Sequence, residues 1–395
     1  MRAPHTSRTL PSGKALTLAA HAAFVPIGVV TVLLSPLLPT LSARWSLNYS
    51  QAGALFTAQF LASTIAVGLS GVLSARCGFR FAIQAGLLVM AASVSLLLAG
   101  SRLLGLGCIA GYGAGLGLAV PAANLLVAEV NPGQRSAALN LLNFSWSAGA
   151  VACPFLVAAA AKNHHVPLLL ALLAGFSLLV VIGIALMPSP AQSTTTSIAE
   201  QKAAIDWMHR SLPIFAILFF VYVGTENSFG GWIASYANSL GSMSLTIAVM
   251  MPSFFYSALM LGRWTAPLVL KRIEEVRLAQ GGLLLACAGM AGLVVSHSLL
   301  PVIVSASAAG LGLSAVYPIT ISLMSREFGS SASRVGSLMF TVANLGGACL
   351  PWLVGAWSNQ LGTLKAGLAV PLVGSAAMYI LYLRTWTSAP AAQPT

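Results

Sequence analysis

The sequence predicts an all-α membrane protein in which twelve transmembrane helices form two pseudo-symmetric six-helix bundles. Hydrophobic residues make up 57% of the chain and charged residues only 7%, whereas a soluble domain has about 25% charged residues. The second half also repeats the order of glycines and prolines of the first half, which indicates an internal duplication. The two copies are Gly115, Gly117, Pro121, Gly149 and Pro154, then Gly310, Gly312, Pro318, Gly346 and Pro351.

Twelve apolar segments are long enough to cross a membrane, since roughly 20 residues of helix span about 30 Å of hydrocarbon. Only helices are expected, because lipid offers the backbone no hydrogen-bond partners and no segment alternates like a barrel strand. The four prolines of the repeat are expected to kink their helices. The segments are 15–41, 50–75, 79–100, 103–128, 136–161, 166–187, 212–240, 245–270, 278–297, 299–324, 333–357 and 364–386.

Polar segments flank and separate the two bundles. Residues 1–14 are predicted to be a cytoplasmic tail, because the apolar stretch that follows is too long for a signal-peptide core. Residues 188–211 are the longest polar connection and are predicted to link the bundle of 15–187 to the bundle of 212–386. Within this linker, residues 198–208 have the composition of an amphipathic helix on the membrane surface. Residues 387–395 form the second cytoplasmic tail.

The distribution of Lys and Arg predicts the orientation. With the N-terminus in the cytoplasm, fifteen of them lie in inside loops or span ends, including Arg263 in the eighth segment, and four lie outside. This excess places both termini in the cytoplasm, and we expect the inner membrane of a bacterium. The cations form no basic patch, so the net charge of +12 does not indicate a nucleic-acid partner. The bilayer is the expected surrounding, and the chain is expected to be a monomer.

No metal, cofactor or enzymatic centre is expected. The cysteines form no CxxC or Cys/His cluster and lie mostly in apolar segments, so they are interpreted as small buried hydrophobic residues. No mid-membrane cluster of His, Asp and Glu suits a metal, and no Ser–His pair indicates a nucleophile. The cysteines are Cys77, Cys108, Cys153, Cys287 and Cys349.

Twelve spans, inside termini, a central linker and a half-chain duplication together resemble the major facilitator superfamily. The loop between the second and third spans adds a local match, because Gly71, Arg76, Gly78 and Arg80 fit the superfamily's signature there. Ala75 stands at the acidic position of that signature, and the corresponding second-half loop also lacks the acid, so the latch that this acid supplies is not expected. The resemblance implies a carrier that works by alternating access, with helices 1, 4, 7 and 10 lining its cavity.

A narrower resemblance rests on three segments in helices 1, 5 and 7. Residues 34–39 read Leu-Ser-Pro-Leu-Leu-Pro, residues 139–144 read Leu-Asn-Leu-Leu-Asn-Phe, and residues 229–232 read Phe-Gly-Gly-Trp. These segments look like the bacterial and fungal branch that includes fucose–proton symporters and related hexose carriers. The branch implies a hexose or a similar polyol as the small-molecule substrate.

Of the seven acidic residues, Glu226 alone lies in the middle of a predicted span. An ionised carboxylate there costs at least about 2.5 kcal/mol, so Glu226 is expected to face a cavity, to bind a proton, or both. A carboxyl group with these properties is what a proton-coupled carrier requires, and Glu226 is therefore the predicted coupling residue. Two alternatives stay open, a structural hydrogen bond between helices and sodium as the coupling ion. Gly230 and Gly231 weaken the helix beyond it and are expected to permit bending or close approach by substrate.

Polar and aromatic side chains inside the spans form the predicted substrate shell. Amides offer donors and acceptors that match vicinal hydroxyls, although each of these residues suits a role in helix packing equally well. Asn143 and Trp146 are the stronger candidates, because positions i and i+3 share one helical face. The set is Gln59, Asn124, Asn143, Trp146, Tyr222, Asn227, Trp232, Tyr256, Tyr317 and Asn344.

His21 lies too close to the cytoplasmic end of the first span to pair with Glu226. The two differ in depth by about 12 Å at about 1.5 Å per residue. His21 is therefore interpreted as a gate at the cytoplasmic mouth or a proton relay, with an interfacial histidine as the alternative.

These observations favour proton-coupled symport of a small neutral solute such as a hexose. The first alternative is proton-antiport efflux of drugs or metabolites, which a cavity rich in Phe and Met would favour, and Met250, Met251, Phe254 and Phe255 keep it open. The second alternative is a transporter-like membrane sensor or partner subunit. Its hallmark, a large soluble extension, does not occur in this sequence.

Overall fold

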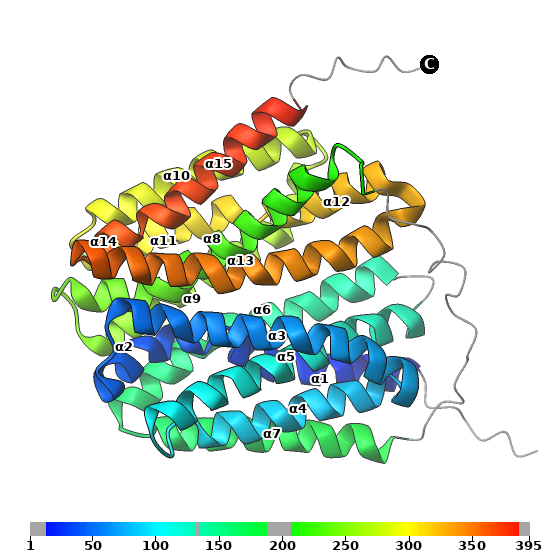
Figure 1. Cartoon of the computed structure of the whole chain (residues 1–395), viewed down its shortest axis with the longest axis horizontal. Helices are drawn as coiled ribbons and strands as arrows, with labels where there is room; N and C mark the ends of the chain where they lie inside the picture. The colour runs from blue at the N-terminus through cyan, green and yellow to red at the C-terminus, as the bar shows by residue number, and fades with distance from the viewer. Residues whose placement is uncertain (1–12, 132–134, 188–206, 387–395) are drawn as a thin grey trace, which may run out of the picture.

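The computed structural model describes residues 13–131, 135–187 and 207–386 (Figure 1). Within these ranges, twelve helical segments are long and apolar enough to span a membrane, which agrees with the predicted number. The two predicted tails, most of the linker and most of the expected surface helix at 198–208 lie outside the described residues.

The helices follow the predicted spans closely. In the first half they are α1 (Gly13–Val32), α2 (Leu34–Trp45), α3 (Tyr49–Cys77), α4 (Phe79–Leu96), α5 (Arg102–Val130), α6 (Arg135–Lys162) and α7 (Val166–Leu186). In the second half they are α8 (Leu212–Ser239), α9 (Leu245–Val269), α10 (Glu275–Val295), α11 (Leu299–Leu313), α12 (Val316–Phe328), α13 (Ala332–Leu361), α14 (Leu364–Gly367) and α15 (Ala369–Trp386).

Three of the twelve spans are divided into two helices. The first span is divided between α1 and α2 at Leu33, the tenth between α11 and α12 at Ser314 and Ala315, and the twelfth between α14 and α15 at Leu368. In each case a proline, Pro36, Pro318 or Pro371, is the third residue after the division. Proline has no N–H to donate to the preceding turn and its ring crowds the carbonyl four residues back, so the helix is interrupted there.

The other repeat prolines do not interrupt their helices. Helices α5, α6 and α13 continue through Pro121, Pro154 and Pro351. The expected kink therefore takes the form of a division before Pro318, while the divisions before Pro36 and Pro371 were not predicted. The first half of the molecule has one divided span and the second half has two.

We call the side on which α1 and α8 begin the terminal face, and the side on which α2 ends and α3 begins the opposite face. The terminal face is the predicted cytoplasmic side. The principal contacts between the two halves join α2 to α8 and α9, α3 to α13, and α6 to α9. Figure 1 shows α3 lying along α13, although these helices are nearly 300 residues apart in the chain.

Hydroxyl groups join the two bundles in the half of the molecule nearer the opposite face. Each hydroxyl donates to a backbone carbonyl of the other bundle. A helical carbonyl oxygen has a second lone pair, so it can accept this bond in addition to the one within its own helix. The bonds run from Ser35 to Gly230 (2.5 Å), from Thr57 to Ala348 (2.8 Å) and from Ser253 to Val151 (2.9 Å). The structure therefore holds the bundles together on the opposite face.

Glycines permit this close contact between α3 and α13. A Cβ atom at Gly355 would lie 2.3 Å from the Tyr49 carbonyl oxygen, and one at Gly53 would lie 2.9 Å from the Trp352 Cα. Neither neighbour is the flexible end of a side chain, because both contacts are to backbone atoms. A larger residue must therefore separate the two helices.

We expect Gly355→Val to open the opposite face. Spin labels at Ala43→Cys and Gln360→Cys, in a background without native cysteines, would then report a distance several ångströms longer, because about 2.3 Å is far below van der Waals contact. The control is Gly175→Val in α7, where an added Cβ meets no atom within 4 Å. An unchanged distance distribution in the Gly355 variant would contradict the packing argument.

Candidate functional site

An ion pair lies between the middle of α8 and the last third of α9. The Arg263 Nη2 atom is 3.6 Å from the Glu226 Oε2 atom, and the two side chains are 27% and 12% exposed. This separation is within ion-pair range but longer than a direct N–H···O hydrogen bond. The carboxylate therefore has a fixed positive partner and keeps room for a proton or for another donor.

The position of Arg263 corrects one inference from the sequence, which counted it among the residues at the inside end of a span. Its Cα lies six residues before the end of α9, and its guanidinium reaches the level of Glu226. Removing Arg263 from the count leaves fourteen Lys and Arg inside against four outside, so the predicted orientation keeps its basis. Glu226 is therefore not an isolated membrane charge but half of a pair.

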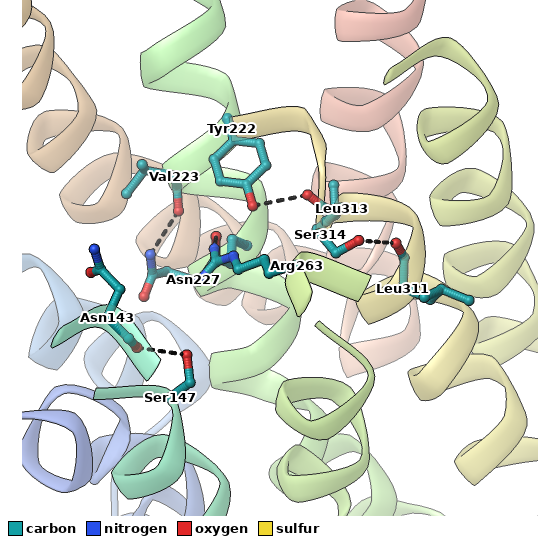
Figure 2. A network of polar contacts seen from close by, with 10 residues as sticks. Asn143, Ser147, Tyr222, Val223, Asn227, Arg263, Leu311, Leu313 and Ser314 are labelled. Carbon is teal, nitrogen blue, oxygen red and sulfur yellow. Dashed lines mark hydrogen bonds and ion pairs between the residues drawn. The ribbon is translucent and has the colours of Figure 1, made fainter. Parts of the chain in front are cut away.

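The pair adjoins the division between α11 and α12. The Tyr222 hydroxyl donates to the Leu313 carbonyl (3.1 Å), and the Ser314 hydroxyl donates to the Leu311 carbonyl (2.6 Å). Carbonyls at a helix end lack partners in the next turn, and the Tyr222 hydroxyl supplies one to Leu313. The Leu311 carbonyl also accepts from the Ser314 N–H (3.3 Å), so the Ser314 hydroxyl adds a second bond there. Figure 2 shows Arg263 beside Tyr222 and this division. Glu226, Arg263 and the segmented tenth span thus form one connected polar region.

Aromatic rings surround this region on one side. The ring centroids of Tyr222 and Tyr317 are 5.1 Å apart, and Tyr317 also contacts Phe219 at 5.5 Å. Tyr256 lies within electrostatic range of Glu226 and Arg263. These rings limit access of lipid to the ion pair and offer faces on which the apolar side of a sugar ring can pack.

A narrow pocket lies between the bundles, close to the ion pair. Three residues of the predicted shell, Gln59, Asn227 and Tyr256, contribute to its wall. The segmented first span contributes Thr31, Val32, Leu34 and Ser35, and the remaining residues are Phe56, Phe60 and Gly231. Sequence reasoning missed Thr31 and Ser35, although both lie beside the proline-containing segment that resembles the hexose carriers. Both bundles line the pocket, but its volume of about 10 Å³ is enough for only about one water molecule, so a solute would need the bundles to separate before it could bind between them.

Three asparagines of the predicted shell share one orientation. The side-chain amides of Asn124, Asn143 and Asn227 each donate to the carbonyl four residues earlier, at 2.8 to 2.9 Å. Only the NH₂ group can make this bond, so the oxygen of each amide points away from its own helix. Figure 2 shows Asn143 and Asn227, which belong to different bundles, in the same region. Each amide oxygen is therefore available to accept a hydrogen bond from a partner outside its own helix.

Two other members of the predicted shell serve the packing of the first bundle. The Gln59 NH₂ group donates to the Thr31 carbonyl (3.1 Å), and its oxygen accepts from the Tyr112 hydroxyl (3.3 Å). The Trp146 indole donates to the Thr31 hydroxyl (3.2 Å). Both side chains therefore fix Thr31, the residue just before the division of the first span. Asn344 is half-buried in α13, and within the described residues no side-chain hydrogen bond joins it to this site.

Trp232 lies away from the ion pair, toward the opposite face. Its side chain is 1% exposed, and its indole donates to the Pro351 carbonyl at 2.9 Å. Its ring contacts Phe56 and Tyr49 at centroid distances of 6.1 and 6.4 Å. We therefore interpret Trp232 as part of the seal between the bundles.

Gly230 and Gly231 serve the same seal rather than a bend, since α8 runs unbroken through both. A Cβ at Gly231 would lie 2.8 Å from the Phe56 ring, and a Cβ at Gly230 would lie 2.6 Å from the Tyr256 hydroxyl. The structure shows close approach by the side chains of Phe56 and Tyr256 and no break in α8, while close approach by substrate stays a prediction.

His21 lies between α1 and α6, apart from the ion pair. Its Nδ1 atom is 2.8 Å from the Ser145 hydroxyl, and its buried Nε2 atom has no hydrogen-bond partner in the described part of the protein. The structure places His21 in the first bundle and Glu226 in the second, in keeping with the expectation that the two do not pair. Its role as a gate or relay stays a prediction.

The loop motif occupies the turn from α3 to α4. Gly78 has φ of +88°, a value that favours glycine. Arg80 donates to the carbonyls of Ile184 and Met187 at the end of α7 (2.7 Å for Met187), where helix carbonyls lack partners. In the second half, Glu275 pairs with Arg326, so an acid does connect α10 to α12 although the loop lacks one at the signature position.

Metal ligands do not gather in residues 13–131, 135–187 and 207–386. In these ranges no group of three or more His, Cys, Asp and Glu side chains is placed to hold a metal ion. The five cysteines are free, and two of them are fully buried. Any cation at Glu226 would therefore rely on that single carboxylate together with neutral oxygen atoms.

Two helical bundles, segmented first and tenth spans and a charged pair beside the bundle interface define a membrane transporter rather than an enzyme. The chain belongs to the Major Facilitator Superfamily, whose family model matches residues 21–351. It is 27% identical over 372 residues to a glucose/galactose transporter of Brucella abortus, with 88% of each chain covered. It is also 24% identical to the glucose/mannose transporter GlcP of Bacillus subtilis over 165 residues, which are 41% of this chain and 39% of that one.

Solved structures show the same fold at low sequence identity. The nucleoside transporter NupG superposes with a TM-score of 0.77 at 12% identity, covering 95% of this chain and 99% of that chain. A D-xylose–proton symporter gives 0.75 at 16% identity, with coverage of 95% and 98%. The fucose–proton symporter FucP of E. coli gives 0.65 at 20% identity, with coverage of 94% and 98%. These structures confirm the expected fold, and the glucose/galactose transporter described above agrees with the resemblance to hexose carriers.

Proposed function

We propose that the chain is a secondary active transporter that carries a sugar together with protons by alternating access. The observation that carries the proposal is the Glu226–Arg263 pair at 3.6 Å, beside a pocket that both bundles line. A carboxylate inside the membrane needs a function or a partner, and this one has a partner that a proton can release. The names of the similar proteins, glucose/galactose transporter and D-xylose–proton symporter, support the same assignment.

The orientation of the asparagine amides supports a substrate rich in hydroxyl groups. In Asn143 and Asn227, which belong to different bundles, the amide nitrogen donates to the residue's own helix and the oxygen is available as an acceptor. A sugar hydroxyl can donate to one of these oxygens and accept from a neighbouring donor, which suits a polyol better than an apolar drug. We therefore place the sugar between these two amides.

Alternating access would follow from the charge of Glu226. Protonation would remove the attraction between Glu226 and Arg263, and the loaded carrier could then reorient without a charged carboxylate at the interface. Loss of the proton on the terminal face, the predicted cytoplasmic side of a bacterial inner membrane, would restore the pair and weaken sugar binding. We propose the proton as the coupling ion, with sodium as the alternative, and a monomer as the working unit.

The efflux alternative loses support from the positions of its candidate residues. Phe254 contacts Phe155 across the bundles with centroids 6.3 Å apart, and Phe255 is fully buried against Phe229. Met251 is 1% exposed. These side chains serve packing in this structure, so they do not give the pocket the apolar wall that a lipophilic drug requires. A sensor or partner-subunit role has no comparable structural observation in its favour.

Uptake into proteoliposomes tests the proposal. Labelled glucose and galactose should accumulate when an inward proton gradient is imposed, and a protonophore should abolish the accumulation. A sodium gradient without a proton gradient should have no effect; accumulation driven by sodium would overturn the choice of ion. Absence of uptake for both sugars under both gradients, in protein shown to be folded, would overturn the assignment of a hexose.

We expect Asn143→Leu and Asn227→Leu each to raise the KM for the sugar about tenfold, because losing one hydrogen bond to the substrate costs about 1.4 kcal/mol. Uptake measured over a range of sugar concentrations checks this. Asn163→Leu is the matched control, since Asn163 makes the same bond to the carbonyl four residues earlier but lies at the end of α6. Equal KM values in all three variants would contradict the placement of the sugar.

A further inference from the structure

A second cavity lies in the outer part of the C-terminal bundle, away from the ion pair. It has a volume of about 290 Å³ and lies between α9 and α10, each of which packs on α11. Its inner wall is formed by buried small residues, Gly262, Gly312, Ser314 and Ala315. Its rim is formed by exposed residues, among them Ile273, Arg277, Gly281, Leu285 and Leu311. The cavity therefore opens through the surface of the bundle.

The surroundings of the rim are apolar and face the membrane. Leu261, Trp264 and Leu268 on α9 are 54%, 68% and 58% exposed, and Leu284 on α10 is 51% exposed. In a membrane-spanning bundle, large exposed apolar side chains of this kind contact lipid rather than water. An occupant that enters through this rim comes from the bilayer.

The terminal-face end of the cavity carries positive charge. Lys271 and Arg272 lie in the turn between α9 and α10, and Arg277 contributes to the cavity wall. Arg277 pairs with Glu274 at 3.2 Å, and both side chains are about three-quarters exposed, while Glu275 pairs with Arg326. Lys271 and Arg272 remain as surplus cations at the level where lipid headgroups lie, and each basic residue there attracts anionic lipid by about 1 kcal/mol.

We propose that this cavity binds one acyl chain of an anionic phospholipid whose phosphate group contacts Lys271, Arg272 and Arg277. The volume is at the lower limit of about 300 Å³ for ligand pockets, which suits one chain segment rather than a whole solute. The apolar wall takes the chain, and the basic turn distinguishes an anionic from a zwitterionic headgroup.

A lipid bound at this site would affect transport, because the inner wall of the cavity adjoins both the ion pair and the division of the tenth span. Gly262 precedes Arg263 in α9, and Ser314 is the residue at which the tenth span divides. A Cβ at Gly262 would lie 2.2 Å from the Ser314 hydroxyl oxygen, so these two walls already touch. An acyl chain against them restricts the motion of α9 relative to α11 and α12.

Native mass spectrometry of the full-length protein tests the binding directly. We expect the detergent-purified protein to retain phosphatidylglycerol several-fold better than phosphatidylcholine of the same chain length. Gly281→Leu should remove most of this retention by filling the cavity, and it should fold normally because an added Cβ meets no atom within 4 Å. Gly183→Leu in α7 is the matched control, since its Cβ is equally unobstructed.

The charged part of the site is tested separately. Lys271→Gln combined with Arg272→Gln should abolish the preference for phosphatidylglycerol over phosphatidylcholine, whereas Arg102→Gln combined with Lys162→Gln, which lie on the opposite face, should leave it intact. Equal retention of the two lipids by the wild type, or unchanged retention in Gly281→Leu, would overturn the proposal. Neither readout requires transport, so the outcome is independent of the proposed sugar symport.

Discussion

Glu226→Gln is expected to abolish proton-driven accumulation of sugar while leaving exchange of sugar across the membrane intact. Glutamine keeps the shape of a protonated carboxyl group, so the variant resembles the state in which the loaded carrier reorients. It cannot release a proton, and a proton gradient then has no group through which to act. A hundredfold accumulation of sugar inside the vesicles corresponds to a free energy of about 2.7 kcal/mol. The loss of such an accumulation is easily measured in proteoliposomes.

Two measurements on the same variant distinguish coupling from substrate binding. Uptake under an inward proton gradient should fall to the level reached without a gradient, and counterflow of labelled against unlabelled sugar should continue at a rate similar to that of the wild type. Accumulation equal to that of the wild type would show that Glu226 is not the coupling group. Loss of counterflow together with accumulation would instead assign Glu226 to sugar binding.

The arrangement beside Glu226 explains how one proton can affect a whole helix. Tyr222 lies one turn before Glu226 on the same face of α8, and its hydroxyl holds the Leu313 carbonyl at the division of the tenth span. Arg263 lies within electrostatic range of both Tyr222 and Glu226. A change in the charge of Glu226 therefore alters the field at the residues that satisfy the broken end of α11. Through these contacts, a change in the charge of Glu226 can affect the position of α12.

The spans and the central carboxylate were predictable because they depend on local sequence. Length and hydrophobicity alone fix where helices cross a membrane, and a single acid among apolar residues identifies Glu226. The divisions of three spans were partly predictable. Pro318 was expected to kink its helix, and the same reasoning applied to Pro36 and Pro371 would have indicated the divisions at Leu33 and Leu368.

Arg263 was missed for a physical reason. A long basic side chain near a helix end usually extends toward water, and the sequence alone does not state that an acid from another helix lies within its reach. One signal was present. Tyr256, Leu259 and Arg263 follow the spacing of a single helical face, and the first two are buried. The roles of Gln59, Trp146 and Trp232 were likewise beyond prediction, because an amide or indole inside a span suits a ligand and a neighbouring helix equally well.

Removing the arginine is expected to impair both proton release and the stability of the fold. Arg263→Gln leaves the Glu226 carboxylate, which is 12% exposed, without its positive partner. An unpaired buried acceptor costs about 1–3 kcal/mol, and the protein avoids this cost by keeping Glu226 protonated. Proton release on the terminal face would then become unfavourable, and we expect accumulation of sugar to fall at least tenfold, together with a lower thermal unfolding temperature.

The double variant Glu226→Gln, Arg263→Gln separates the pair from its members. Two amides can satisfy each other, so the double variant should unfold at a higher temperature than Arg263→Gln alone and should regain counterflow without accumulation. Arg263→Lys is the conservative control, since it keeps the charge but loses the planar fork of the guanidinium, and partial accumulation is expected. If the changes in unfolding temperature of the two single variants add up to that of the double variant, the two residues are not energetically coupled. The 3.6 Å separation would then reflect proximity alone, and the transport cycle would not depend on the ion pair.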